Sequence, residues 1–285
     1  MALLSTIDLC NSRDTTGANL YATWRKAPTQ ATANGIWFDL SLSPGNPNPQ
    51  YYAAAPLTST NLASNHGGLP ASQAVSPATK YLQRMMALCS TAACLPMQMI
   101  VLDYLMFYAF CDETVTGPQT MTQSAVLTRY ANGVGVQMMA VATAAQTGGQ
   151  SFTVSYTNSA GVSGRTTAPV TTNAQGLIGT ILTSATATNG AAGPFLPLQS
   201  PDTGVQSIQS INFATTDIGL VCLVLVKPIA SLNLPGIDAV AEVDYFKDFS
   251  VLPIIQDNAY LNLICMPAGS LNGAVIHGEI ITNWG

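Results

Sequence analysis

The sequence predicts a mainly β protein, an antiparallel β-sandwich with the jelly roll as one possible form. Apolar residues alternate with polar residues in many segments after Gly133, which is the period expected of strands. Gly, Pro and Asn residues separate these segments at short intervals, as turns do. Helical spacing of apolar residues stands out in one early segment, so we expect about one or two short helices. Many short strands divided by turns are typical of a sandwich.

Residues 1–76 are predicted to form an N-terminal segment and an extended arm. Pro, Gly, Asn, Ser and Ala dominate from Ser41 to Pro77, most densely from Pro44 to Pro49. Each proline restricts its own backbone and that of the residue before it, so a helix or a central strand cannot run through this region. The aromatic residues expected to pin the arm are Trp37, Phe38, Tyr51 and Tyr52. We expect this arm to make a contact between subunits.

The remaining residues, 77–285, are predicted to form the sandwich core, and the two parts together could be a single structural unit. A helix over about 77–94 is expected to open the core, with Ser76 as its N-cap and Pro77 in its first turn. The apolar residues at helical spacing are Tyr81, Leu82, Met85, Met86, Leu88 and Cys89. Pro96 marks the latest point at which this helix can end.

Seven later segments have the pattern of strands, and one of them is the alternating stretch from Val134 to Ala140. The apolar run from Met99 to Tyr108 predicts a strand buried on both faces. Phe152 to Tyr156 and Val162 to Thr167 flank a turn sequence and predict a hairpin. Further strands are expected from Ile218 to Val226, stopped by Lys227-Pro228, from Tyr260 to Met266, and from Ala274 to Trp284.

The charge content excludes several classes of partner. Charged residues make up 8% of the chain, against roughly 25% in ordinary domains. Nine basic residues stand against fourteen acidic ones without clustering, so we expect no nucleic-acid partner. A surface of neutral hydroxyl and amide groups repels its own copies weakly, which favours a homo-oligomer.

No membrane partner or exported form is expected. The longest apolar stretch, Met97 to Cys111, is interrupted by Asp103 and is shorter than the about 20 residues of a membrane-spanning helix. Met1 to Asp8 lacks the features of a signal peptide. The cysteines are scattered, at positions 10, 89, 94, 111, 222 and 265, so free thiols and assembly in a reducing cytoplasm are expected.

No catalytic, cofactor-binding or metal-binding residues are predicted, and we expect the protein not to be an enzyme. His66 and His277 lack the motifs of hydrolases or metal sites. Asp103 lies in the most apolar segment, so it must be hydrogen-bonded, paired or at an interface if that segment is buried. A structural pair is favoured over a catalytic acid, and Lys80, Arg84 and Arg129 are the nearest basic residues in the sequence.

Four carboxylates lie close together between Gly236 and Phe249. They are Asp238, Glu242, Asp244 and Asp248. Their spacing lacks the regular pattern of a calcium loop, and no aromatic pattern of a glycosidase cleft accompanies them. A solvated or interface strand face is the main interpretation of this stretch, with an ion site left open.

Several segments resemble the head-associated structural proteins of tailed bacteriophages, the class that decorates or cements the capsid. The segments that carry the resemblance are Trp37 to Leu40 leading into Pro44 to Pro47, Ser76 to Leu82, Leu102 to Leu105, Ser151 to Asn158 with Gly161 to Thr167, and Leu225 to Pro228. The resemblance implies a non-catalytic virion protein without cofactors, a homo-oligomer such as a trimer. It would be assembled in the host cytoplasm, bind the outer capsid surface, and bridge and stabilise the major capsid subunits.

Two other functions stay open at this stage. A phage vertex or tail protein could recognise a host surface glycan through loops of the sandwich, although Trp24, Trp37 and Trp284 lie toward the termini. A hydrolase would need a histidine beside a serine and a carboxylate in one cleft.

Overall fold

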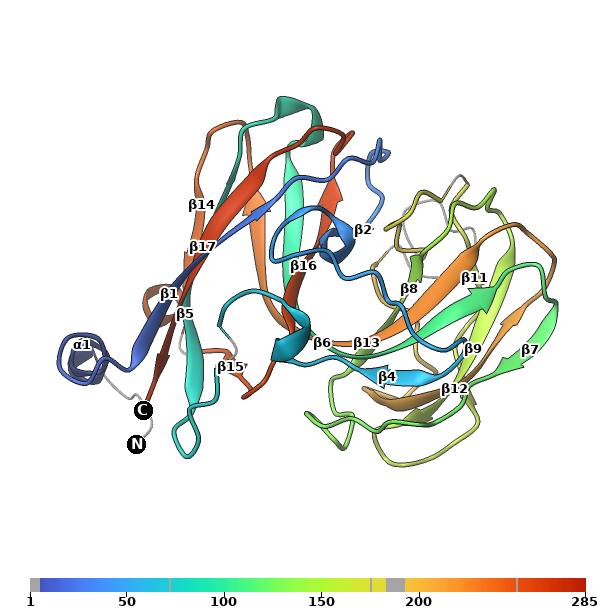
Figure 1. Cartoon of the computed structure of the whole chain (residues 1–285), viewed down its shortest axis with the longest axis horizontal. Helices are drawn as coiled ribbons and strands as arrows, with labels where there is room; N and C mark the ends of the chain where they lie inside the picture. Colours follow the sequence, from blue (N-terminus) through green and yellow to red (C-terminus); the bar gives the residue numbers. More distant parts are fainter. Residues whose placement is uncertain (1–5, 72, 175, 183–192, 250) are drawn as a thin grey trace.

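The chain forms two β-sandwich lobes joined by two long strands (Figure 1). A computed structural model describes residues 6–71, 73–174, 176–182, 193–249 and 251–285. Strands account for 45% of the structure and helices for 7%, and the strand pairs are antiparallel. The predicted fold class, a mainly β antiparallel sandwich with few helices, is therefore confirmed.

The first sheet forms the outer layer of one lobe. Its strands, in spatial order, are β14 (Ala241–Asp244), β5 (Lys80–Cys89), β17 (Ile276–Trp284), β1 (Asn19–Lys26) and β3 (Gly45–Asn46), and β15 (Ile254–Ile255) also pairs with β5. The pairing of β1 with β17 brings the beginning and end of the chain together. Residues of the predicted N-terminal segment thus belong to the sandwich itself.

The central sheet runs through both lobes. Its strands are β2 (Phe38–Asp39), β16 (Leu261–Pro267), β6 (Met97–Asp112), β13 (Leu220–Leu234) and β8 (Gln137–Ala142), with β4 (Ser59–Asn61) also pairing with β6. The β6–β13 pair contains three register shifts. Such bulges bend a strand pair and increase its twist, which suits two strands that leave one sandwich and enter the next.

The third sheet covers the second lobe. It comprises β10 (Arg165–Thr166), β9 (Ser151–Asn158), β11 (Val170–Thr171) and β12 (Val205–Phe213), and β7 (Gly117–Thr120) runs beside β12. The helical elements are α1 (Thr6–Asp14), α2 (Tyr245–Asp248) and the short 3₁₀ turns η1 (Leu40–Leu42), η2 (Ser64–His66) and η3 (Ala92–Cys94). The hairpin predicted from Phe152 to Thr167 is confirmed as β9 and β10.

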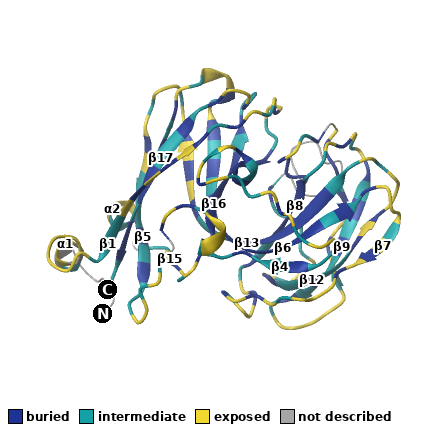
Figure 2. Ribbon diagram, viewed as in Figure 1, coloured by how far each residue is buried: buried dark blue, intermediate teal, exposed yellow. Residues whose placement is uncertain are grey.

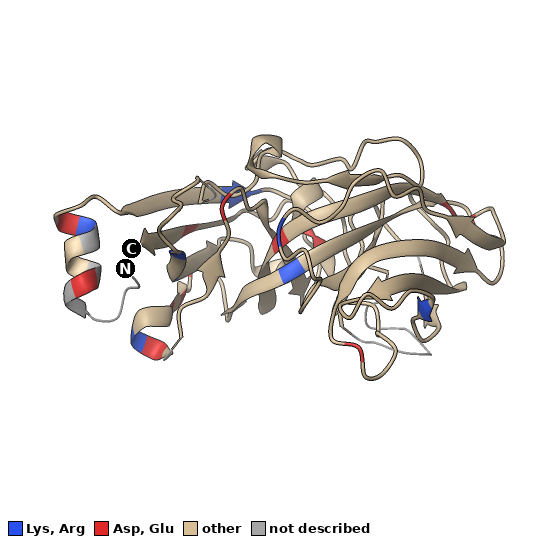
Figure 3. Cartoon of the chain, turned by 90° about the horizontal axis from the view of Figure 1, so that it is seen from below, with Lys and Arg blue, Asp and Glu red and all other residues tan. Residues whose placement is uncertain are grey.

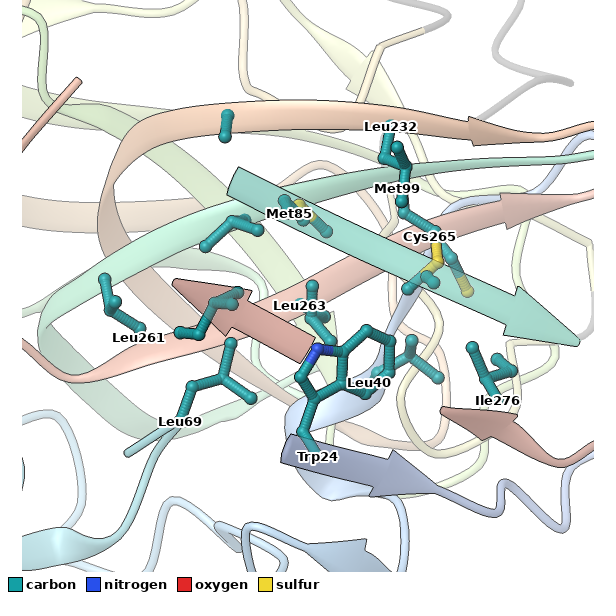
Figure 4. Close-up of a cluster of buried hydrophobic side chains, with 14 of the residues drawn as sticks. Trp24, Leu40, Leu69, Met85, Met99, Leu232, Leu261, Leu263, Cys265 and Ile276 are labelled. Carbon is teal, nitrogen blue, oxygen red and sulfur yellow. The ribbon is translucent and has the colours of Figure 1, made fainter. Parts of the chain in front are cut away.

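Three apolar cores follow from this layering, and the strands of the central sheet are buried (Figure 2). The first core lies between the first sheet and one end of the central sheet, where Trp24 and Met85 face Met99 and Leu263 (Figure 4). The second core lies between the third sheet and the other end of the central sheet. The third core covers the opposite face of the central sheet. The predicted strand over Met99 to Tyr108, buried on both faces, is therefore confirmed.

The predicted helix over 77–94 is wrong, because Lys80–Cys89 is strand β5. Its pairing with β17 passes from Leu82 to Arg84 while β17 advances by one residue, so β5 contains a bulge at Gln83. The bulge shifts the alternation of buried side chains by one position, from Leu82 to Met85. An apolar spacing of three residues then has the appearance of a helical period, although the backbone is extended.

Strand β13 continues beyond the predicted stop at Lys227-Pro228 and ends at Leu234. Its pairing with β8 ends at Val226, so Pro228 lies where one edge of β13 no longer has this partner. A register shift against β6 follows between Pro228 and Ala230. Proline is tolerated at strand edges and bulges because its missing N–H is not needed there.

The arm predicted between Ser41 and Pro77 packs against its own chain. Tyr52 and Leu62 are fully buried in the third core, and Leu69 is buried in the first core. The aromatic residues predicted to pin the arm do so in part, since Trp37, Phe38 and Tyr52 are buried, whereas Tyr51 is exposed. The arm therefore covers the central sheet, and its predicted contact with other subunits stays a prediction.

The last two predicted strands lie near the end of the chain. The strands expected from Tyr260 to Met266 and from Ala274 to Trp284 are confirmed as β16 and β17. All six cysteines are free thiols, and only Cys10 is exposed. Within the described residues, no helix combines the length and the apolar character that crossing a membrane requires.

Candidate functional site

An apolar edge on the first sheet is the main candidate interaction surface. Five of its large apolar side chains, all between residues 237 and 254, are about half exposed or more: Ile237 (52%), Val240 (52%), Phe249 (56%), Val251 (75%) and Ile254 (49%). We refer to these five residues as the apolar edge. Isolated exposed apolar side chains are ordinary in soluble proteins, but several of them in one short segment indicate a contact surface.

Two short strands place the apolar edge along the outer side of β5. Strand β14 pairs with β5 through Ala241 opposite Ala87, and β15 pairs with β5 through Ile254 opposite Tyr81. Between these strands lies α2, whose Tyr245 is buried in the first core. The ring of Tyr245 stacks on that of Phe249, with 5.3 Å between the centroids, and holds Phe249 beside the helix.

The predicted carboxylate stretch supports this turn. Asp244 is the N-cap of α2, and its Oδ1 accepts hydrogen bonds from the backbone N–H groups of Phe246 (3.0 Å) and Lys247 (3.1 Å). Asp248 Oδ2 accepts a hydrogen bond from the backbone N–H of Asp244 at 3.2 Å. Glu242 lies 3.7 Å from Arg84. Within the described ranges, no three histidine, cysteine or acidic side chains form a metal-binding group.

The outer face of the first sheet carries a polar cluster next to the apolar edge. Glu279 is only 6% exposed and accepts hydrogen bonds from Arg84 and from the hydroxyl of Tyr21. Burial alone would raise the pKa of Glu279, but these two donors outweigh it and lower the pKa below its usual value. Figure 3 colours the charged residues, which are sparse along the rest of the ribbon.

A buried ion pair fastens the arm to the central sheet. Arg129 donates from Nε to Asp103 Oδ2 at 2.9 Å and from Nη2 to Asp103 Oδ1 at 2.8 Å. Arg129 Nη2 also donates to the backbone carbonyls of Leu62 and Tyr104, and Tyr260 N–H donates to Asp103 Oδ1. The predicted structural pair of Asp103 is therefore confirmed, with Arg129 as the partner. Burial of Asp103 raises its pKa even though Arg129 acts to lower it.

A second buried carboxylate, Asp39, was not predicted from the sequence. Its oxygens accept hydrogen bonds from the hydroxyls of Tyr52 at 2.5 Å and Tyr104 at 2.7 Å, and from the backbone N–H of Ser41 at 2.8 Å. Burial raises the pKa of Asp39, although these donors act to lower it. The available signal was an acid between apolar neighbours, Phe38 and Leu40, which is the same signal that identified Asp103.

A polar cavity of about 380 Å³ lies beside the Asp103–Arg129 pair. It is lined by Ala63, Ser64, Asn65, Thr128, Arg129, Asp257 and Asn258. Two opposite-charge pairs are near it, Asp103 with Arg129 and Asp257 with Lys80, the latter at 3.8 Å. The charged groups around the cavity therefore balance, and its amide and hydroxyl side chains suit a neutral polar molecule.

The two histidines lie on separate elements. His66 is at the end of η2, exposed, and its Nδ1 contacts the backbone of Ala63. His277 lies on β17, opposite Leu88 on one side and Arg25 on the other. Neither contact forms a nucleophile, base and carboxylate arrangement.

These features define the chain as a mainly β sandwich protein whose buried polar groups support its fold. No protein-family model and no curated protein matches the chain. The chain is weakly similar to two solved structures of infectious bursal disease virus. The Gt strain structure has 9% identity, a TM-score of 0.19, and coverage of 93% of this chain and 80% of the other. The Gx strain structure has 10% identity, a TM-score of 0.17, and coverage of 93% and 79%. TM-scores this low do not define a shared fold.

Proposed function

We propose that this protein is a non-catalytic structural component of a virion that assembles as a homo-oligomer, such as a trimer, on the outer surface of a bacteriophage capsid. There it bridges major capsid subunits and stabilises the shell. The observation that carries the proposal is the apolar edge, because it exposes five large apolar side chains in an 18-residue segment of a chain with 8% charged residues.

The energy of this surface fits an assembly of many copies. Full burial of a Val, Ile or Phe side chain contributes roughly 1.5–3 kcal/mol, and these side chains are already about half buried. One edge therefore offers on the order of 5 kcal/mol. Association costs about 4–15 kcal/mol in lost freedom of motion. A single contact is thus marginal, whereas several contacts made together in a symmetric assembly bind strongly.

The buried ion pair and the Asp39 cluster support the same proposal. They hold the arm and the central sheet together with charge-assisted hydrogen bonds. A cement protein must transmit load between its neighbours without opening. The buried hydrogen bonds that join the arm to the sheet resist such opening.

The proposal is tested by sedimentation of the purified protein and by counting copies in purified particles. The variant Phe249→Asp/Val251→Asp places charges on the apolar edge. The matched control is Val162→Asp, since Val162 is 51% exposed in the turn after β9. We expect the wild type and the control to form oligomers and to reach copy numbers comparable to the major capsid protein. The edge variant should be monomeric and absent from particles. A wild type that stays monomeric at high concentration and is missing from particles would refute the proposal.

A second candidate function, recognition of a host surface glycan by a vertex or tail protein, is favoured by the charge-balanced polar cavity. Its amide and hydroxyl side chains could exchange hydrogen bonds with sugar hydroxyls. Glycan-array binding that disappears in Asn65→Ala and Thr128→Ala would support this function. A copy number of a dozen or fewer per particle would support it over the cement role.

A further inference from the structure

Two cysteine side chains meet in the first core. Cys89 is the last residue of β5, and Cys94 is the last residue of η3. Their Sγ atoms are 3.6 Å apart, and both side chains are fully buried. We propose that Cys89 and Cys94 form a disulfide when the protein meets a small-molecule disulfide oxidant of the glutathione type. That this happens when a virion leaves the reducing cytoplasm rests on the proposed function.

The backbone around the two thiols is held in place, so the bond requires mainly side-chain movement. The backbone carbonyl of Cys89 accepts from Asp238 N–H at 3.1 Å, and that of Cys94 accepts from Ala268 N–H at 3.1 Å. A disulfide bond is about 2.05 Å long, so the sulfurs must approach by roughly 1.5 Å. Both thiols also contact the carbonyl of Thr91, which places them on the same side of the short connection.

The reactivity of this pair differs from that of the other buried thiols. The hydrogen bond with the Cys94 thiol lowers the pKa of Cys89, and that of Cys94 is raised in turn. Burial raises the pKa of Cys111 to about 12 and that of Cys222 well above its usual value. Since the thiolate is the reacting form, Cys89 is the better nucleophile.

Access to the pair depends on the connection that covers it. Ser90, Ala92 and Ala93 are exposed, so the two thiols lie beneath a surface segment that needs only a local opening. The thiolate of Cys89 then attacks one sulfur of the small disulfide, breaking its S–S bond and releasing one small thiolate. Cys94 loses its proton and attacks the Cys89 sulfur of the mixed disulfide, releasing the second small thiolate. The protein loses two electrons and two protons, and the oxidant becomes two thiols.

The bond would join the two layers of the first lobe. Strand β5 belongs to the first sheet, and η3 leads into β6 of the central sheet. A disulfide between Cys89 and Cys94 therefore links the two sheets covalently at the end of the sandwich. The closed loop is short, so the gain in stability should be modest, which we expect as a rise of a few degrees in Tm.

The experiment uses the full chain, purified with reductant and then incubated in its folded state with oxidised glutathione. Free thiols are alkylated after denaturation, and the protein is cleaved after aromatic residues, because Tyr104 separates the Cys94 peptide from the Cys111 peptide. We expect Cys89 and Cys94 to escape alkylation together, in one peptide whose mass is lower by two hydrogens, while the buried Cys111, Cys222 and Cys265 are alkylated. Cys10 is exposed and can take up glutathione, so its state is not part of the readout.

The variants identify the pair. Cys89→Ser and Cys94→Ser should each abolish the mass change and the rise in Tm, whereas Cys222→Ser, the matched buried control, should keep both. Alkylation of both Cys89 and Cys94 in the wild type after prolonged oxidation would overturn the proposal, and so would an intramolecular disulfide that joins either of them to another cysteine. This readout uses the isolated protein, so its failure is distinct from a failure to assemble.

Discussion

Replacing Arg129 by methionine should destabilise the protein strongly. The change leaves the Asp103 carboxylate fully buried, with Tyr260 N–H at 3.0 Å as its remaining donor from this cluster. It also removes the donor to the carbonyls of Leu62 and Tyr104. Removing one partner of a buried ion pair costs about 3–5 kcal/mol because the other charge stays uncompensated. We expect the free energy of unfolding to fall by about 4 kcal/mol, measured by urea denaturation.

The loss of stability in Arg129→Met should be larger at higher pH. Burial already raises the pKa of Asp103 in the folded protein, and without Arg129 this pKa rises further. The native state then binds a proton that the unfolded state has released, so stability decreases as pH rises from the unfolded pKa to the folded pKa. The deficit of the variant relative to wild type should therefore be larger at about pH 7.5 than at about pH 5.

Arg165→Met is the matched control for this prediction. Arg165 pairs with Asp202 near the surface, where Tyr156 and Asn158 also donate to the same carboxylate. Arg165→Met should therefore lower the free energy of unfolding much less than Arg129→Met does. The reasoning would be refuted by an Arg129→Met deficit below about 1 kcal/mol, or by a deficit of equal size at both pH values.

Two further predictions concern the other buried carboxylates. Tyr52→Phe removes the hydroxyl that donates to Asp39 and should lower the free energy of unfolding by about 1–3 kcal/mol in urea denaturation. No measurable loss would show that Tyr104 and Ser41 alone are enough to stabilise the buried Asp39 carboxylate. Glu113 is fully buried directly after β6 and accepts a hydrogen bond from the side-chain amide of Gln150 at 2.6 Å. Burial raises the pKa of Glu113 to about 7, so its contribution to stability is present at low pH and is lost as pH rises through about 7. Glu113→Gln should remove this part of the pH dependence of Tm between pH 5 and 8, and an unchanged dependence would contradict the assignment.

The pairing of Asp103 shows how much of the candidate site the sequence predicts. A carboxylate within a strand buried on both faces must be hydrogen-bonded, paired or at an interface, so a structural partner for Asp103 was predictable. Three basic residues were candidates, and the choice of Arg129 depends on a loop that returns to β6 from 26 residues further along the chain. Asp39 carried a similar signal but lies in a segment of two-residue strands, where periodicity is not measurable.

The apolar edge was less accessible to sequence reasoning. In the sequence, the four carboxylates are the visible feature of residues 237–254, and in the structure they are a helix cap and surface groups. Phe249 and Val251 are exposed in the folded chain, and nothing in their local sequence marks these residues as different from core residues.

The amino-acid sequence by itself determined the mainly β class, the doubly buried strand β6 and the low charge of the surface. These properties follow from residue type and local alternation, which each segment carries alone. The tertiary structure decided the two-lobed arrangement, the fold of the arm onto its own sheet, and the extended conformation of β5. A bulge or a strand register is set by the partner strand, and for β5 that partner is β17, about two hundred residues later in the chain.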